Sequence, residues 1–243
     1  MTQNAFLGTI GFIKGNLMSN PELLDKGYSN ETFYPGASNI PNSHTSDKTK
    51  MEVSIFGNLN HKIENNVVIW ATSMSSQSGY LHVTNLPKLH NEDGSYIFNT
   101  FEMQIAYGRY DSTNKYNCFM FGFIPDTQSR VGTTDTSCQI SNVLGQVLRL
   151  ITPDTQTYSL GKISYQSYKV GIKYFVNFKY DAINRIASGK IWQEDEAGAI
   201  TVLSEVTQPD VDADFGDKLV LASGNTDSCR GILYLNECWF KLT

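Results

Sequence analysis

The sequence has no cluster of basic residues and no long apolar run. No run of Lys and Arg exceeds two residues, and 19 basic against 24 acidic side chains give a formal net charge of −5. Nucleic-acid binding needs a basic stripe that displaces counterions from phosphates, so we expect no nucleic-acid partner. No stretch of about 18 apolar residues occurs, so we also expect no membrane insertion.

Signals of secretion and of a cysteine-based site are also lacking. Residues 1–20 have neither a basic segment nor the continuous apolar segment of a signal peptide, so we expect none. The four cysteines include no C-x-x-C pair, and they are Cys118, Cys138, Cys229 and Cys238. We interpret them as buried thiols, with disulfides as the open alternative because their number is even.

Residues that favour β-structure are abundant instead. The chain has 13 Tyr and 13 Phe with many Val, Ile and Thr, whereas only 18% of residues are charged. β-branched and aromatic side chains suit a pleated, half-buried surface. A length of 243 residues fits one β-sandwich, since such domains run to about 200–250 residues.

Short strand-like runs separated by Gly, Asn, Asp and Pro fill the chain from residue 51 onward. The segment Tyr174–Tyr180, for example, alternates so that its apolar residues share one face. No helical period of useful length appears, so the pattern predicts an all-β fold. The predicted strands are Met51–Phe56, Asn66–Ala71, Tyr80–Val83, Phe98–Tyr107, Asn117–Ile124, Val143–Ile151, Tyr174–Tyr180, Ile186–Gln193, Ile200–Val206, Lys218–Ala222 and Gly231–Leu242.

The first 50 residues differ from the rest. Residues 19–50 are rich in Asn, Ser, Thr, Gly and Pro and have no sustained period, which predicts a loop or an extended arm. Residues 1–18 are more apolar and could form one or two short strands. We therefore predict an N-terminal arm or anchor over 1–50 and a sandwich domain over 51–243.

Several of these stretches resemble one family. They are Asn66–Leu81, Tyr96–Tyr107, Gly171–Gln193, Lys218–Gly224 and Gly231–Leu242, and they are similar to strands of concanavalin A-like, laminin-G-like jelly-roll domains. In this form the domain is common in tail and other virion proteins of bacteriophages. The resemblance implies an all-β, two-sheet antiparallel jelly-roll sandwich with an extended N-terminal arm.

The resemblance also implies a function. It favours a non-enzymatic structural component of a bacteriophage virion, associated with the tail or a fibre, that recognises a host-surface glycan or docks on other virion proteins. It implies a homo-oligomer, for which a trimer is one option, located in the virion after assembly in the host cytoplasm. Two alternatives stay open: a free carbohydrate-binding, lectin-like module, and a glycoside hydrolase of the same fold.

Aromatic residues supply the candidate ligand site, because a ring face can stack on the C–H face of a sugar. Each tryptophan lies in a predicted strand, where core packing is the alternative. Trp192 ends its strand beside an acidic turn, which favours exposure. The polar, aromatic loop after strand Phe98–Tyr107 adds further candidates. The predicted ligand-binding residues, for a glycan or a protein, are Trp192, Tyr107, Arg109, Tyr110 and Tyr116.

Acidic residues supply a candidate metal site. Asp210, Asp212, Asp214 and Asp217 alternate through one connecting segment, and Ca²⁺ prefers such hard oxygen ligands. The alternative is a plain acidic connection between strands. We expect no other cofactor.

No catalytic residues are predicted. Retaining glycosidases need two carboxyl groups about 5–5.5 Å apart across a cleft. The acids Glu194, Asp195 and Glu196 are consecutive and precede a glycine, which indicates a solvated hairpin tip.

The closing segment Gly231–Leu242 carries Glu237 and Cys238 beside a tryptophan. Strict alternation would place Leu233 on the same face as Trp239, and Cys238 on the opposite one. Each face then mixes polar and apolar residues, so a bulge near Asn236 and Glu237 is expected.

Overall fold

The computed structural model describes twelve stretches of the chain. They are residues 31–34, 47–56, 60–64, 67–71, 80–109, 119–124, 139–143, 147–151, 156–162, 169–216, 218–221 and 230–243. Among these residues, no helix has the length and hydropathy needed to cross a membrane.

The described strands form two sheets. In the part of the chain that the structure describes, the first sheet has eight strands in the order β1-β3-β6-β15-β8-β9-β10-β11. Their bounds are β1 Glu31–Tyr34, β3 Val53–Phe56, β6 Tyr80–Val83, β8 Phe119–Ile124, β9 Gln139–Val143, β10 Val147–Ile151, β11 Thr157–Lys162 and β15 Lys218–Leu221.

The second sheet has nine described strands. Seven follow the order β14-β13-β12-β7-β16-β5-β4, while β17 pairs with both β7 and β2. Their bounds are β2 Thr49–Lys50, β4 Asn60–Glu64, β5 Val67–Ala71, β7 Thr100–Arg109, β12 Lys173–Asp181, β13 Ile186–Glu194, β14 Ile200–Gln208, β16 Arg230–Tyr234 and β17 Trp239–Leu242.

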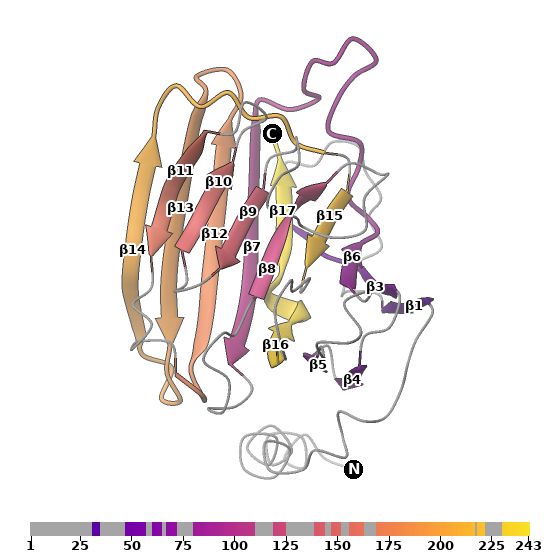
Figure 1. The fold of residues 1–243 in the computed structure, drawn as a ribbon, viewed down its shortest axis with the longest axis vertical. Helices are drawn as coiled ribbons and strands as arrows, with labels where there is room; N and C mark the ends of the chain where they lie inside the picture. The colour runs from indigo at the N-terminus through magenta and orange to yellow at the C-terminus, as the bar shows by residue number, and fades with distance from the viewer. Residues whose placement is uncertain are drawn as a thin grey trace.

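The two sheets pack face to face, with strands β8–β11 in front of β7 and β12–β14 in Figure 1. Every described pairing of strands is antiparallel. The protein is thus an all-β, concanavalin A-like jelly-roll sandwich, as the sequence predicts. The two sheets pack together because each buries its apolar face against the other.

Strands β4 and β11 were not predicted, and two further features differ from the predicted strands. The segment Val143–Ile151, predicted as one strand, is the end of β9 and all of β10, joined as a hairpin in which Val143 lies opposite Val147. Strands β1 and β2 fall inside residues 1–50, predicted as an arm, and they pair with β3 and β17 of the sandwich. Residues 1–30 and 35–46 lie outside the described residues, so the domain boundary at residue 50 stays a prediction.

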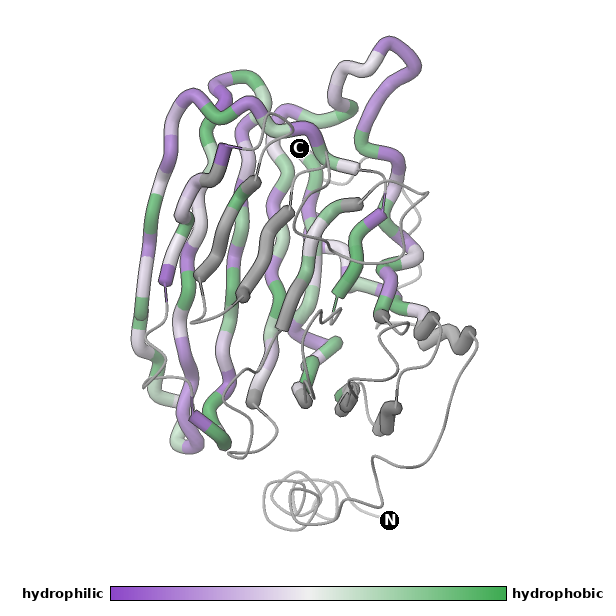
Figure 2. The backbone as a smooth tube through the Cα atoms, in the orientation of Figure 1, coloured by the Kyte–Doolittle hydropathy of each residue, from purple (hydrophilic) through white to green (hydrophobic). Residues whose placement is uncertain are grey.

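Side chains along the nine-stranded sheet alternate between the core and the outside. In β12, Tyr174, Val176 and Phe178 are buried against the other sheet, while Asn177 and Lys179 face outward. Figure 2 shows the corresponding succession of apolar and polar residues along these strands. Because neighbouring strands keep register, their outward residues also line up across the sheet.

Phe215 lies at the centre of a cluster of aromatic rings in the core. Its ring centroid is 4.8 Å from that of Phe123, 5.3 Å from Tyr180 and 5.8 Å from Phe101. Phe215 belongs to the extended connection between β14 and β15, so this connection is anchored in the core rather than lying loosely across it.

A short 3₁₀ turn at Leu235–Glu237 separates β16 from β17. Leu233 of β16 lies opposite buried Tyr107, and Phe240 of β17 lies opposite buried Met103. The turn therefore shifts the alternation by one residue. The irregularity expected near Asn236 exists, but it is a helical turn instead of a bulge, and strict alternation is wrong for the residues after it.

Candidate functional site

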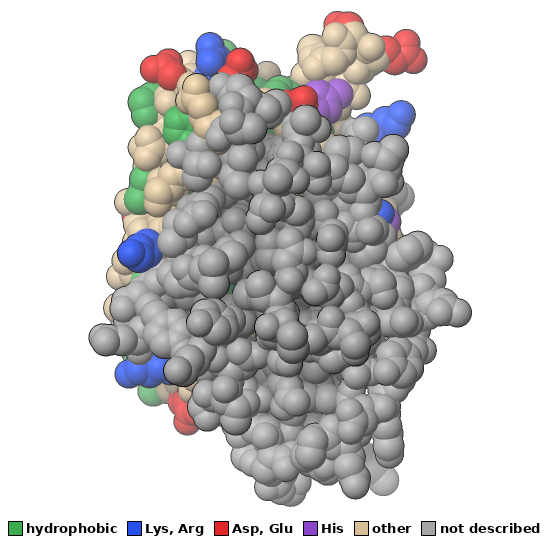
Figure 3. Space-filling model, in the orientation of Figure 1, with side chains coloured by type: hydrophobic (Ala, Val, Ile, Leu, Met, Phe, Trp, Pro, Cys, Tyr) green, Lys and Arg blue, Asp and Glu red, His purple; other side chains and the backbone are tan. Residues whose placement is uncertain are grey.

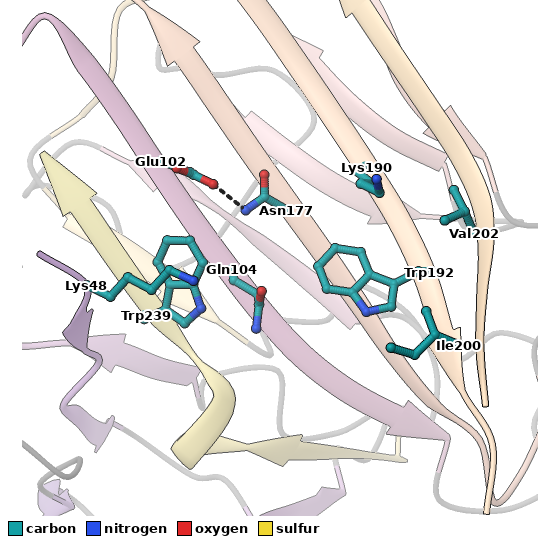
Figure 4. A pocket seen from close by; sticks show the side chains of 9 residues that line it. All are labelled: Lys48, Glu102, Gln104, Asn177, Lys190, Trp192, Ile200, Val202 and Trp239. Atoms are coloured by element: carbon teal, nitrogen blue, oxygen red, sulfur yellow. Dashed lines mark hydrogen bonds between the residues drawn. The ribbon is translucent and has the colours of Figure 1, made fainter. Parts of the chain in front are cut away.

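A shallow groove lies on the outer face of the nine-stranded sheet, the face turned away from the other sheet. Its volume is about 500 Å³. The lining residues come from strands β7, β12, β13, β14 and β17 and from the residue just before β2, and Figure 4 shows them all. They are Lys48, Glu102, Gln104, Asn177, Lys190, Trp192, Ile200, Val202 and Trp239.

Strand register places four of these residues in one row across the groove. Trp239 of β17 lies opposite Gln104 of β7, and Gln104 lies opposite Asn177 of β12. Asn177 in turn lies opposite Lys190 of β13. Partners in such a row share one face of the sheet, so an indole, two amides and an ammonium group follow one another across four strands.

Trp192 lies two residues further along β13 than Lys190, on the same face. Its indole stacks on the ring of its cross-strand partner Phe175, with centroids 5.0 Å apart and planes 4° from parallel. On its other side Trp192 lies opposite Val202 of the edge strand β14, which is 52% exposed. The indole is half-buried and is held by packing in a fixed orientation.

Trp239 forms the other end of the groove. The 3₁₀ turn directs it outward, although its neighbours Cys238 and Phe240 are fully buried. The ammonium group of Lys48 lies over its indole, 4.1 Å from the ring centroid, in a cation–π contact. Trp239 is consequently only 6% exposed. In Figure 4 the two indoles lie on either side of Gln104 and Asn177.

The amides between the indoles are held by hydrogen bonds. Asn177 Nδ2 donates to Glu102 Oε1 at 2.9 Å, and Gln104 Nε2 donates to the backbone oxygen of Glu237 at 2.9 Å. Each bond uses one of the two amide hydrogens. A carboxamide has a second hydrogen and a carbonyl oxygen, which is the donor–acceptor pair that a sugar hydroxyl group can use.

The predicted aromatic site is only partly assembled. Trp192 lines the groove, and its role as a ligand residue stays a prediction. Tyr107 has no exposed surface, because it faces the core opposite Leu233 and packs 5.9 Å from the ring of Tyr174; its prediction as a ligand residue is therefore wrong. The side chain of Arg109, the last residue of β7, lies outside the described part of the structure. Tyr110 and Tyr116 also lie outside it, so these three ligand residues stay predictions.

The aspartates of the 209–216 segment do not converge. Val211, Ala213 and Phe215 are buried, so Asp212 and Asp214 point outward on the alternate positions. Asp214 approaches His90 at 3.5 Å, whereas Asp212 approaches Arg185 at 3.9 Å.

Asp210 is exposed as well. Asp217, the fourth predicted calcium ligand, lies outside the described residues. Within the described ranges, no group of three or more His, Cys, Asp or Glu side chains could hold a metal ion. The geometry thus does not support the predicted calcium loop. Figure 3 shows acidic side chains and a histidine together at that end of the molecule.

The other acids have structural partners. Asp195 Oδ1 accepts hydrogen bonds from the backbone of Ala197 and Ala199, so the run after β13 is a hairpin turn as predicted. Glu237 pairs with Lys173 at 2.8 Å on the outer face.

Cys238 is a buried thiol. Burial raises its pKa to about 12. Its sulfur accepts a hydrogen bond from the Ala106 backbone at 3.4 Å, at the place where the 3₁₀ turn interrupts the strand ladder.

The sequence signal missed Trp239, Gln104, Asn177 and Lys48. Gln104 and Asn177 are polar positions of two alternating strands, so the sequence pattern alone predicts that they face outward. Their position between two tryptophans was not, because it depends on which strands become neighbours.

The fold and the groove define a concanavalin A-like β-sandwich with an aromatic-rimmed surface site. Several solved structures are similar to it, among them two lectins. A seed lectin isoform of Lotus tetragonolobus matches with a TM-score of 0.50 at 10% identity, over 88% of this chain and 98% of the lectin. The winged bean acidic lectin, complexed with methyl-α-D-galactose, matches with a TM-score of 0.50 at 12% identity, over 86% and 97%.

At these identities the likeness shows the fold alone. No model of a known family matches the chain, and no curated protein matches its sequence. The jelly-roll part of the sequence resemblance is therefore confirmed. Neither lectin bears on virion membership, which stays a prediction.

Proposed function

We propose that this protein is a carbohydrate-binding, lectin-like module that holds its ligand on the outer face of the nine-stranded sheet. The observation that carries the proposal is the groove with a tryptophan at each end and two carboxamides between them. Of the functions predicted from the sequence, this geometry favours the free lectin-like alternative over the virion component.

The chemistry of the groove suits a sugar. The pre-stacked indole of Trp192 offers a flat apolar surface to the C–H face of a pyranose ring, at little entropic cost because the side chain is already ordered. Gln104 and Asn177 offer donors and acceptors beside it. The winged bean lectin of similar fold is known in complex with a galactoside, which agrees with this class of ligand.

The groove favours binding over hydrolysis. Glu102 is the one carboxylate among its described lining residues, and it accepts the hydrogen bond from Asn177. Hydrolysis by either two-carboxylate mechanism needs an acid and a second carboxylate across the sugar. The described lining residues therefore suffice for sugar binding but do not supply the two carboxyl groups that a glycosidase needs.

A glycan array followed by calorimetric titration of the tightest ligand tests the proposal. We expect Trp192→Ala to weaken binding at least about tenfold, because it removes the aromatic platform at one end of the groove. Trp192→Phe keeps a ring and should retain most of the affinity. Ile183→Ala removes an exposed apolar side chain, 69% exposed, on the β12–β13 turn and serves as the matched control.

Thermal melts of the same variants separate binding from folding, since Trp192→Ala loses the stack on Phe175, about 0.5–1.5 kcal/mol, in addition to the apolar area that the indole buries. A folded Trp192→Ala variant with unchanged affinity would contradict the proposed site. An array without any bound glycan would contradict the proposed function.

Virion membership and homo-oligomerisation remain predictions of the sequence resemblance. Sedimentation equilibrium of the full chain checks the oligomer, for which the resemblance predicts a trimer as one option. Co-purification with phage particles checks the location.

A further inference from the structure

Positive charge gathers on the outer face of the nine-stranded sheet. Lys241 and Lys179 lie opposite Glu102 on its two sides, in the row next to the one that holds Gln104. Lys190 pairs with Glu205 across β13 and β14 at 3.0 Å. The charged residues of the two rows and of Lys48 comprise five lysines and two glutamates: Lys48, Lys50, Lys179, Lys190, Lys241, Glu102 and Glu205.

Together with Lys173 and its two partners Glu194 and Glu237 on the same face, these residues have a formal excess of two positive charges, although the whole chain has a net charge of −5. A local positive field attracts anionic ligands even on a chain whose net charge is negative. The charges are distributed around Glu102 and along the groove, so they would meet an extended ligand rather than a single ion.

Lys48 is the cation placed to contact such a ligand. Its ammonium group lies on the indole of Trp239 at the end of the groove. Among the described residues, no carboxylate lies within 4.0 Å of it. An anionic group arriving in the groove would give this ammonium group a charge-assisted hydrogen bond without breaking an ion pair.

We propose that the groove binds an extended acidic oligosaccharide, with a sugar ring stacked on Trp192 and a carboxylate or sulfate group paired with Lys48. This inference rests on the proposed function and names the class of its ligand. Trp239 and Trp192 belong to β17 and β13, which are three strand spacings apart, about 14 Å. The site thus spans more than one sugar unit.

The position of Lys48 also explains why an acidic chain is preferred to a neutral one. A neutral sugar would have to displace the ammonium group to reach the indole of Trp239. An acidic unit uses the ammonium group where it lies. Lys179 and Lys241 then supply the longer-range attraction, which salt screens over about 10 Å at 0.1 M ionic strength.

Calorimetric titration with three oligosaccharides tests the inference: a hexamer of galacturonic acid, the same hexamer with its carboxyl groups reduced, and a sulfated heparin hexasaccharide. We expect at least one acidic chain to bind at least about tenfold tighter than the reduced chain, with an affinity that falls as NaCl rises. Preference for the galacturonate or the heparin chain identifies the anionic group as carboxylate or sulfate.

Variants localise the effect. Lys48→Ala should weaken acidic binding about tenfold without weakening binding of the reduced chain, because it also uncovers the indole of Trp239. Lys48→Arg should restore the acidic binding. Lys162→Ala is the charge-matched control, because Lys162 is exposed on β11 of the other sheet.

The outcomes separate the two proposals. If the reduced chain binds as tightly as the acidic chains and Trp192→Ala weakens all of them, the acidic preference is wrong and the lectin-like function stands. If acidic chains bind but neither Lys48→Ala nor Trp192→Ala changes the affinity, the groove is not the site and both are overturned. If none of the three chains binds, the acidic preference is overturned, and the glycan array decides the function alone.

Discussion

Trp239 faces the outside of the sandwich although Cys238 and Phe240 on either side of it are buried. Local alternation alone would put Trp239 on the face of Leu233, in the core. The 3₁₀ turn at Leu235–Glu237 shifts the phase, and Phe240 takes the core position instead. One turn of three residues therefore decides whether the chain has a second aromatic platform.

Tyr234, just before this turn, shows how tightly the outer face is packed near the groove. Its hydroxyl oxygen lies 3.3 Å from where a side chain on Gly108 would begin, so only glycine fits there without movement. Lys173 contacts the ring of Tyr234 and pairs with Glu237. Burial, with a smaller contribution from the charge of Glu237, raises the pKa of Tyr234 to about 12.

This pKa predicts a loss of stability at high pH. In the unfolded chain the phenol ionises with a pKa of 10.0, whereas in the folded protein it stays neutral up to about pH 12. The contribution of the neutral phenol to the free energy of unfolding is therefore full below pH 10 and is lost as the pH rises towards 12. By pH 11 the loss amounts to about 1 kcal/mol. Urea titrations from pH 8 to pH 11 measure it.

The control is Tyr234→Phe, which has no group to ionise. Its free energy of unfolding should fall less steeply than that of the wild type over this range. Parallel pH profiles of the two proteins would show that the phenol of Tyr234 ionises equally well in both states.

At the scale of elements, strands with strong alternation were predictable and weakly patterned ones were not. The prediction located β12 and β13 to within a residue at each end. It missed β1, β2, β4, β11 and most of β9, and of these β1, β4 and β11 lie at sheet edges. An edge strand pairs on one side only and needs fewer apolar residues, so its sequence carries a weaker signal.

Strand β17 contributes both to the core and to the nine-stranded sheet. Phe240 and Leu242 are fully buried, and the strand pairs with both β7 and β2. The backbone of Thr243 also bonds to Asn99 and Thr100. Burial of the two side chains alone contributes about 3–6 kcal/mol, against a typical total stability of about 5–15 kcal/mol.

We therefore expect deletion of residues 239–243, or of all of residues 231–243, to abolish cooperative folding. Circular dichroism melts of the truncated chains measure this. Lys241→Ala, which changes an outward residue of the same strand, should melt within a few degrees of the wild type. A truncated chain with a sharp transition would mean that β17 is dispensable and that the assigned fold is wrong.

At the scale of the whole molecule, the acidic end of the sandwich is organised by the core instead of by a metal. Phe215 anchors the 209–216 segment, and the aspartates are left on its solvent side. Asp212 and Asp214 face different basic residues, so their carboxylates are not aimed at a common point.

Calcium should therefore have little effect on stability. We expect the melting temperature to change by less than about 1 °C between 5 mM CaCl₂ and 5 mM EDTA, because only a ligand that binds the folded state stabilises it. Differential scanning calorimetry checks this, with MgCl₂ as the control for ionic strength. A rise of several degrees in the melting temperature with calcium but not with magnesium would show that the aspartate segment binds calcium after all.

The sequence by itself determined the β-class, the positions of the strongly alternating strands and the outward direction of residues such as Gln104 and Asn177. These follow from a period of two residues and from composition, which are local properties. It also favoured exposure of Trp192 at the end of a strand, and the structure leaves this indole half-buried.

Only the tertiary structure decided that Trp192 and Trp239 lie at the two ends of one groove, with Lys48 over one of them. Pairing between β17, β7, β12 and β13 joins segments far apart in the chain, and the 3₁₀ turn sets which face Trp239 occupies. Strand order and register arise from burying all the apolar faces at once, so a local pattern could not reveal them.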